Sequence, residues 1–364
     1  MLKLFSDLLA AGPITPSPSR GGKGGEGSSS RATHPHGPRP VASLGLPRPN
    51  LPLEGEGTNL KFLRSVKAAL LLTAIVVFSS SSFAALSILA TSPEWGALAT
   101  EIGGDKVNVY IATTALQDVH RVEARPSLMA RARNADLLVA TGADLEVGWL
   151  PVLQRESGNS KIQIGSLGFF EAAQEVRLLD VPASVDRSMG DIHPFGNPHI
   201  LLDPRNIARV GNALTKRLGG IDNANKEFYE ARNTAFQERM RQTIPQWEAK
   251  AAPLKGTPVV VYHKDQQYLL NWLGLREVGS LEPKPGVPPS TGHLTDLLQR
   301  LQKEPAKVIL INAYNDPKPA TWLAERTKIP VVTLPYTVGG TKEAKDLFGL
   351  FDDTIARLLA GIKQ

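Results

Sequence analysis

The sequence predicts an α/β protein of two lobes, each a parallel or mixed sheet with flanking helices, joined by one long rigid helix. Two observations support this fold class. Segments with the character of strands and helices alternate twice along the chain, which is typical of parallel sheets covered on both faces. Between the two alternating halves, residues 222–251 are dense in Ala, Glu, Arg, Lys and Gln and contain only one proline, Pro245. This composition favours a long helix.

The first half supplies the elements of one lobe in order. Each expected strand is a short apolar run, and each expected helix has apolar residues on one face. We expect strands at 86–90, 107–112, 136–142 and 161–165, and helices at 93–103 and 127–135. Asp203 and Pro204 then mark the start of a helix, because Asp is a favoured cap and Pro is favoured in the first turn. That helix should reach about Leu218, before the break at Gly219 and Gly220.

The second half repeats this layout. Strands are expected at 257–263, 276–280, 307–312 and 329–334, and helices at 265–273, 291–303, 319–327 and 342–362. A proline-rich loop at 282–289 interrupts the series. The domain prediction is therefore an N-terminal lobe at 85–220, a linking helix at 221–252 and a C-terminal lobe at 253–364.

The first 84 residues are expected to lie outside the fold. Residues 1–59 are rich in Gly, Pro, Ser and Arg, which indicates a disordered extension or an over-extended reading frame. Residues 60–84 combine basic residues, the apolar run 68–78 and small residues, which is the pattern of a secretory signal peptide. The chain has no cysteine, so we expect no disulfide and no lipid anchor on an N-terminal cysteine. Together these features predict a periplasmic protein.

The charge is concentrated at the N-terminal end. Of 41 Lys and Arg and 35 Asp and Glu, residues 1–84 hold 9 and 4, which leaves 32 and 31 and a net charge of +1 for the remainder. A remainder so nearly neutral argues against nucleic-acid binding.

Histidines follow the expected strands or stand in stiff turns. His120 follows the strand at 107–112, His263 ends the strand at 257–263, and His193 and His199 flank a turn with two prolines and a glycine. Ligands gather at the carboxyl ends of strands in α/β folds, and neutral imidazole is a common zinc ligand. These four residues are the candidate metal ligands, His193 being assigned less firmly. His293 is interpreted as a surface or capping residue.

Four strings of the chain resemble a known family. They include residues 120–127, 196–204 and 278–290 and the pair Tyr262 and His263, and they are similar to the cluster A-I solute-binding proteins of ABC importers (ZnuA/TroA-like). The resemblance implies two α/β lobes joined by one long helix, with a metal ion bound in the cleft. It implies ligand status for His120, His199 and His263. It also implies a permease and an ATPase as partners, and we expect a monomer that is not an enzyme.

The chain departs from the family pattern in ways that leave the fourth ligand open. The family commonly supplies a carboxylate after the last strand of the second lobe, where residues 333–340 contain no acid, and Asn312 stands where many relatives have Glu. The fourth position is His193, water, or a carboxylate such as Glu282 or Asp118. Three imidazoles without a certain carboxylate favour Zn²⁺ as the transported ion over Mn²⁺, which prefers oxygen donors.

Two other functions remain as alternatives. A binding protein for a metal chelate of the siderophore type would have a similar architecture and aromatic or arginine residues in the cleft. A zinc hydrolase would combine three protein ligands with a water molecule, but the chain has no His-Glu-x-x-His pair. Calorimetric titration of histidine variants with zinc distinguishes a bare-metal receptor from the chelate receptor.

Overall fold

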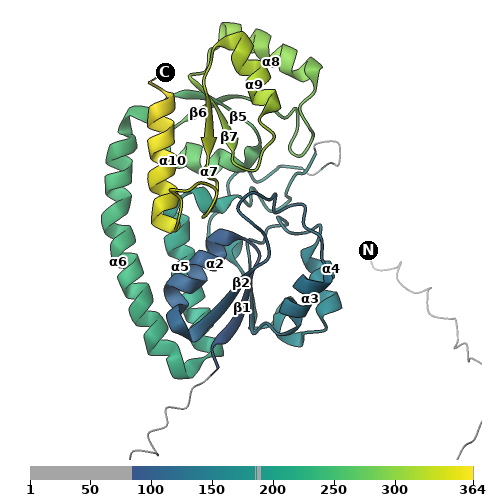
Figure 1. Cartoon of the computed structure of the whole chain (residues 1–364), viewed down its shortest axis with the longest axis vertical. Helices are drawn as coiled ribbons and strands as arrows, with labels where there is room; N and C mark the ends of the chain where they lie inside the picture. Colours follow the sequence, from purple (N-terminus) through teal and green to yellow (C-terminus); the bar gives the residue numbers. More distant parts are fainter. Residues whose placement is uncertain (1–83, 185, 187–189, 364) are drawn as a thin grey trace, which may run out of the picture. The chain divides into compact units, whose positions relative to one another are not determined.

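The computed structural model describes residues 84–184, 186 and 190–363. The predictions for residues 1–59 and, except for Ala84, for the signal peptide at 60–84 fall outside these described residues. Within them the chain forms two α/β lobes (Figure 1).

The N-terminal lobe is built on a four-stranded parallel sheet in the order β2-β1-β3-β4. Its strands are β1 (Leu86–Ala90), β2 (Val107–Ile111), β3 (Leu137–Ala140) and β4 (Phe169–Glu171). Its helices are α2 (Pro93–Gly103), α3 (Pro126–Arg133), α4 (Leu150–Ser157) and α5 (Pro204–Ile221).

The C-terminal lobe has the same architecture, with the parallel order β6-β5-β7-β8. Its strands are β5 (Pro258–Val261), β6 (Arg276–Ser280), β7 (Val308–Asn312) and β8 (Val331–Leu334). Its helices are α7 (Gln267–Leu273), α8 (Thr291–Lys303), α9 (Lys318–Thr327) and α10 (Leu347–Gly361). Both predicted sheets are therefore present, and both are wholly parallel.

The predicted long helix is α6, which spans the 26 residues Lys226–Ala251 and runs alongside both lobes (Figure 1). It packs against α5 and α2 of the first lobe and against α10 of the second. Pro245 lies inside it without ending it. The helix before it also runs further than expected, because α5 continues through Gly219 and Gly220 to Ile221.

The strand predicted at 161–165 is wrong. The structure has a short 3-10 helix at Ser160–Ile162, where the side chain of Asn159 accepts a hydrogen bond from the Lys161 backbone N–H. The alternation of Ile162 and Ile164 resembles a strand, but Ile162 is buried while Ile164 is exposed. The fourth strand lies later, at β4, where Phe169 and Phe170 pair with β3.

Apolar residues fill both faces of each sheet. One continuous core runs from β1 and α2 past α5 and α6 to β5, β7 and α10. A second core lies between the first sheet and helices α3 and α4, and a third between the second sheet and helices α8 and α9. The loops at the carboxyl ends of the strands carry the polar residues described below.

Among the described residues, no helix combines the length and the apolar character that a membrane span requires.

Candidate metal centre

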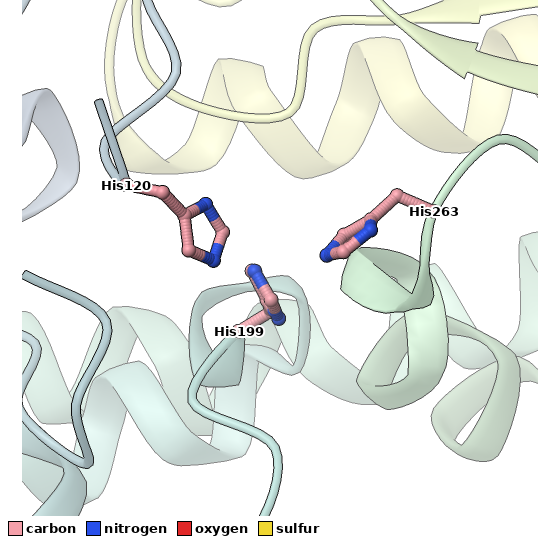
Figure 2. A group of neighbouring side chains, drawn as sticks. All are labelled: His120, His199 and His263. Carbon is pink, nitrogen blue, oxygen red and sulfur yellow. The ribbon is translucent and has the colours of Figure 1, made fainter. Parts of the chain in front are cut away.

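Three of the predicted histidines come together between the lobes (Figure 2). Each of His120, His199 and His263 offers one ring nitrogen, and these three nitrogens all lie within 4.8 Å of one another. The ring centroids are 5.2 Å apart for His120 and His199, 5.3 Å for His199 and His263, and 5.8 Å for His120 and His263. Side chains this close are able to share one ion.

Each histidine is delivered by an ordered segment. His120 lies in the loop after β2, and the Trp149 indole N–H anchors this loop by donating to the Val119 carbonyl at 2.8 Å. His199 directly precedes the buried 3-10 helix Ile200–Leu202, which leads into α5. His263 follows the buried strand β5. The three residues therefore come from three separate segments, two in the first lobe and one in the second.

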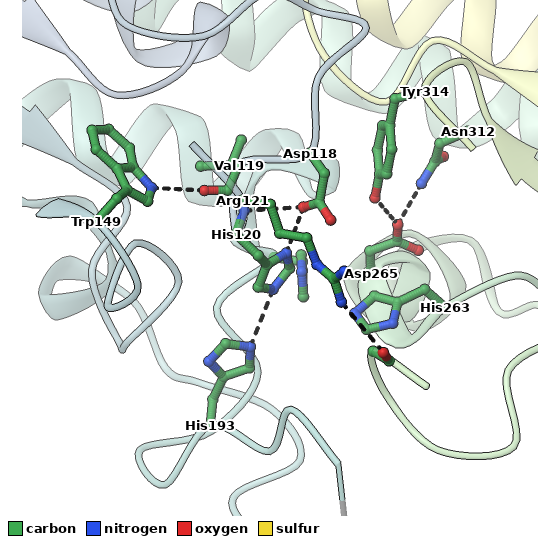
Figure 3. A network of polar contacts seen from close by, with 12 residues as sticks. Asp118, Val119, His120, Arg121, Trp149, His193, His263, Asp265, Asn312 and Tyr314 are labelled. Atoms are coloured by element: carbon green, nitrogen blue, oxygen red, sulfur yellow. Dashed lines mark hydrogen bonds and ion pairs between the residues drawn. The ribbon is translucent and has the colours of Figure 1, made fainter. Parts of the chain in front are cut away.

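All three imidazoles are held through the same atom, Nδ1. Its partner is Asp118 Oδ1 for His120 at 2.7 Å, Asn197 Oδ1 for His199 at 2.8 Å and Glu282 Oε2 for His263 at 2.7 Å (Figure 3 for Asp118). Carboxylate and amide oxygens accept hydrogen bonds, so Nδ1 of each ring donates. The second nitrogen, Nε2, is then left with a free lone pair, which is the form that binds a metal.

The network around His199 fixes the orientation of Asn197. Asn197 Oδ1 also accepts from the His199 backbone N–H at 3.0 Å, and Asn197 Nδ2 donates to the Lys264 carbonyl in the other lobe at 2.7 Å. His199 Nε2 is buried and has no hydrogen-bond partner among the described residues. A buried polar atom without a partner is costly, and a metal ion would satisfy it.

His193 lies beside this group and outside it. Its Nε2 is 3.4 Å from His120 Nε2, and its ring centroid is 5.9 Å from that of His199 (Figure 3 for the His120 contact). It is not one of the three residues whose nitrogens lie within 4.8 Å of one another. Burial, together with the positive charges of His120 and His263, lowers the pKa of His193 to about 4. His193 is therefore neutral at physiological pH and close enough to approach a bound ion.

The two most buried histidines have opposite pKa shifts. Burial and the charges of His120 and His263 lower the pKa of His199 well below its usual value. Burial alone would also lower the pKa of His263, but the hydrogen bond to Glu282 and the charges of Asp265, Glu282 and Asp118 outweigh it and raise the pKa. A proton therefore competes with a metal ion more strongly for His263 than for His199.

Carboxylates surround the imidazoles without joining the three-nitrogen group. Asp118 and Glu282 are engaged by the histidines that they hold, and Glu282 Oε2 also accepts from the Gly286 N–H at 2.9 Å.

Tyr336, in the segment after β8, is buried with its ring centroid 6.5 Å from that of His199. Two cavities, of about 300 Å³ and 230 Å³, adjoin His263, and Asp191 lines both.

Two residues near the site, Asn197 and Asp265, were not predicted from the sequence as site residues. Asn197 stands two positions before His199, and Asp265 two positions after His263. For Asn197, which orients the His199 ring, the polar side chain two residues before a candidate ligand is a signal that the sequence does contain.

His293 lies apart from the group, and its ring Nε2 is 2.9 Å from the Ser280 carbonyl oxygen. The Ser290 side chain caps helix α8 by accepting from the His293 N–H, so Ser290 is the capping residue, and His293 is half-buried in the first turn.

Comparison with known proteins identifies the family. The model of the ZnuA family, described as zinc-uptake complex component A, periplasmic, matches residues 88–361. The chain belongs to this family. It is a metal-binding substrate-binding protein of an ABC importer. Proteins of this kind act outside the cytoplasm with the permease and ATPase components of the importer.

Curated relatives include proteins named for two metals. The manganese ABC transporter substrate-binding lipoprotein PsaA of Streptococcus pneumoniae is 22% identical over 275 residues, which cover 74% of this chain and 85% of that protein. The high-affinity zinc uptake system protein ZnuA of Brucella abortus (strain 2308) is 24% identical over 150 residues, 41% of this chain and 45% of that protein.

Solved structures share the fold. A crystal structure of ZnuA has a TM-score of 0.62 and 21% identity, and the match covers 76% of this chain and 98% of that one. A Mn-bound periplasmic metal binding protein from Candidatus Liberibacter asiaticus matches with a TM-score of 0.62, 18% identity and the same two coverages.

Proposed function

We propose that this ZnuA-family protein captures Zn²⁺ in the periplasm and delivers it to its permease, with His120, His199 and His263 as the protein ligands. The observation that carries the proposal is the shared orientation of the three rings. Each donates through Nδ1 to a fixed oxygen, and the nitrogens that remain meet between the lobes. A carboxylate or amide behind a ligating histidine fixes its tautomer and strengthens its basicity.

The donor set favours zinc over manganese. Three neutral imidazoles suit Zn²⁺, which is commonly bound by nitrogen at about 2.0–2.1 Å in a tetrahedral arrangement. Mn²⁺ prefers oxygen ligands, and no carboxylate among the described residues joins the three-nitrogen group. The fourth ligand is then water or His193, whose Nε2 lies 3.4 Å from that of His120.

The alternative of a chelate receptor is less well supported. Pockets for drug-sized ligands are about 300–1,000 Å³, and the two cavities beside His263 are about 300 Å³ and 230 Å³. Arg121 lines the smaller one, but its guanidinium donates to the Gly286 carbonyl at 3.4 Å. A naked or hydrated ion fits these dimensions better than a siderophore complex.

The alternative of a zinc hydrolase is also less well supported. Asp118 and Glu282, which adjoin the histidines, are both occupied in holding imidazole rings. We propose instead a binding protein without catalytic activity, exported, without a lipid anchor and monomeric. The secretory pattern at 60–84 and the absence of cysteine support export without a lipid anchor.

Calorimetric titration with zinc tests the ligand set. His120→Ala, His199→Ala and His263→Ala should each weaken binding by more than the roughly 10- to 100-fold expected for loss of an outer partner. His293→Ala is the matched control and should bind as the wild type does, because its ring lies against the Ser280 carbonyl. Unchanged affinity in any of the first three variants contradicts the assignment.

A further inference from the structure

Asp265 is a fully buried carboxylate with only one of its oxygens satisfied. The residue has no exposed surface. Its Oδ2 accepts from Asn312 Nδ2 at 2.5 Å and from the Tyr314 hydroxyl at 2.6 Å (Figure 3). Its Oδ1 is buried with no hydrogen-bond partner among the described residues. The polar network extends to Gln266, whose Nε2 donates to Asn312 Oδ1 at 2.7 Å.

This carboxylate lacks a cationic side chain. The ion pairs of the described residues include none between Asp265 and a lysine or arginine. Carboxylates are almost never fully buried unless they are paired or bind a metal. The two hydrogen bonds hold one oxygen and leave the other without a partner, so the ionised carboxylate has room for one more interaction.

The histidine group lies next to Asp265. Asp265 follows His263 by two residues and lies beside it (Figure 3). Burial raises the pKa of its carboxyl, and the charges of His263 and His120 oppose this rise. The Nδ1 of each of these rings is already engaged, by Glu282 and Asp118 respectively. The positive charge that remains available to Asp265 is that of the ion between the rings.

We propose that Asp265 is an outer anionic partner of the bound metal ion, acting through a water molecule in the fourth ligand position. The inference rests on the proposed function. A direct ligand would lie no more than about 4.2 Å from each nitrogen, since zinc bonds to nitrogen and oxygen are about 2.0–2.2 Å. Asp265 is not part of the group within 4.8 Å, and Asn312 and Tyr314 hold its other oxygen. We therefore place a water molecule between Asp265 and the ion.

This arrangement explains how a site of neutral ligands holds a divalent ion. The three imidazole ligands are neutral, and the carboxylates of Asp118 and Glu282 act on the ion only through the rings that they hold. Asp265 adds a fixed negative charge and an acceptor for a metal-bound water, without adding an oxygen ligand. The residue would thereby increase affinity for divalent cations while leaving the nitrogen-rich ligand set unchanged.

The variant Asp265→Asn tests this, because it removes the charge and keeps the shape. Zinc affinity, measured by competition with a chromophoric chelator, should fall about 10- to 100-fold. The visible spectrum of the Co²⁺-loaded protein should keep its band positions, since the ligands do not change. The melting temperature of the metal-free variant should not fall, because Oδ1 of Asp265 has no hydrogen-bond partner to lose.

Asp353→Asn is the matched control. Asp353 is also buried, but its Oδ2 is paired with Arg357 at 2.6 Å and accepts from Thr341. Its loss should lower the melting temperature of the metal-free protein and leave zinc affinity unchanged. This contrast separates a role in metal binding from a role in folding.

Three results would overturn the inference. If Asp265→Asn binds zinc as tightly as the wild type does, Asp265 has no role in metal binding. If the bands of its Co²⁺-loaded form shift, Asp265 is a direct ligand. A fall in metal-free stability like that of Asp353→Asn, without loss of affinity, would make the role structural. If His199→Ala loses zinc while Asp265→Asn does not, this inference fails and the proposed function stands; if His199→Ala keeps zinc, the proposed function itself fails.

Discussion

Each imidazole of the site is held by a different oxygen, and His199 and His263 consequently differ in their affinity for protons. Asn197 is neutral and leaves burial to dominate, so the pKa of His199 falls well below its usual value. Glu282 is a carboxylate, and it is a main reason that the pKa of His263 rises despite burial. The metal must displace protons from an imidazole before it binds. His263 is therefore the residue that sets the acid limit of binding.

Zinc affinity should accordingly fall as pH drops through the raised pKa of His263, with His199 and His193 still neutral. In Glu282→Gln the carboxylate is gone, so burial lowers the pKa of His263. The fall of zinc affinity at acid pH, here called the acid limb of the profile, should therefore move to lower pH. Affinity at neutral pH should fall about 10- to 100-fold, because the ring loses its charged partner. Titration calorimetry from pH 5 to pH 8 measures both effects.

Glu304→Gln is the control for that experiment, because Glu304 is exposed and pairs with Arg276. Its pH profile should coincide with that of the wild type. An acid limb at the same pH in Glu282→Gln and the wild type would show that His263 does not control binding.

At the scale of elements, helix α6 shows how a mostly polar sequence is held in place. Its buried residues are spaced by 7, 4, 7 and 4 positions, which places them in one narrow seam on a helix: Tyr229, Phe236, Met240, Trp247 and Ala251. Phe236 contacts the ring of Phe348 in α10, and Trp247 contacts the rings of Trp272 and Phe351. The seam attaches the linking helix to the second lobe.

Trp247→Ala should therefore destabilise the protein by about 3–5 kcal/mol, because it leaves a cavity among aromatic rings. The hydrogen bond from Trp247 Nε1 to Asp352 Oδ1, 2.9 Å long, is lost as well. Urea denaturation of the metal-free protein measures the change. Trp247→Phe should cost less, and Arg241→Ala on the solvent face should show no measurable effect. A loss below about 1 kcal/mol in Trp247→Ala would be incompatible with this account of the helix.

At the scale of the whole described fold, the proposed ion connects two lobes that are already linked by polar contacts. Asn197 in the first lobe donates to Lys264 in the second, and the Thr337 hydroxyl donates to the buried carboxylate of Glu94 at 2.6 Å. His120 and His199 belong to one lobe and His263 to the other. Binding an ion between them stabilises the closed arrangement of the native state over any opened or unfolded form.

Zinc should thus stabilise both lobes together. At free zinc about 100 times the dissociation constant, the gain is about 2.7 kcal/mol, seen as one transition at higher temperature in differential scanning calorimetry. His263→Ala, which removes the contribution of the second lobe, should lose most of this shift, and a chelator should reverse it in the wild type. Two separate transitions, with zinc moving only one, would show that the ion does not couple the lobes.

Local signals predicted much of the fold. Strand β6 and helix α8 have the predicted bounds, and α5 begins at Pro204 after the Asp203 cap, whose side chain accepts from the Arg205 N–H. The prediction failed at residues 161–165, where two isoleucines that alternate with polar residues have the sequence pattern of a strand. There Asn159 satisfies the Lys161 N–H locally, and this competes with pairing in the sheet.

The sequence by itself determined the two α/β lobes, the linking helix and the candidate histidines, because each depends on periodicity, capping or position at a strand end. Tertiary structure alone decided which of the four histidines meet, which oxygen holds each ring, and that Asp265 is buried with one oxygen unpartnered. These features arise from contacts between residues such as Asn312 and Asp265, or Glu282 and His263, that lie 47 and 19 positions apart. No local pattern encodes such distances; they exist only once the sheets close and the cores pack.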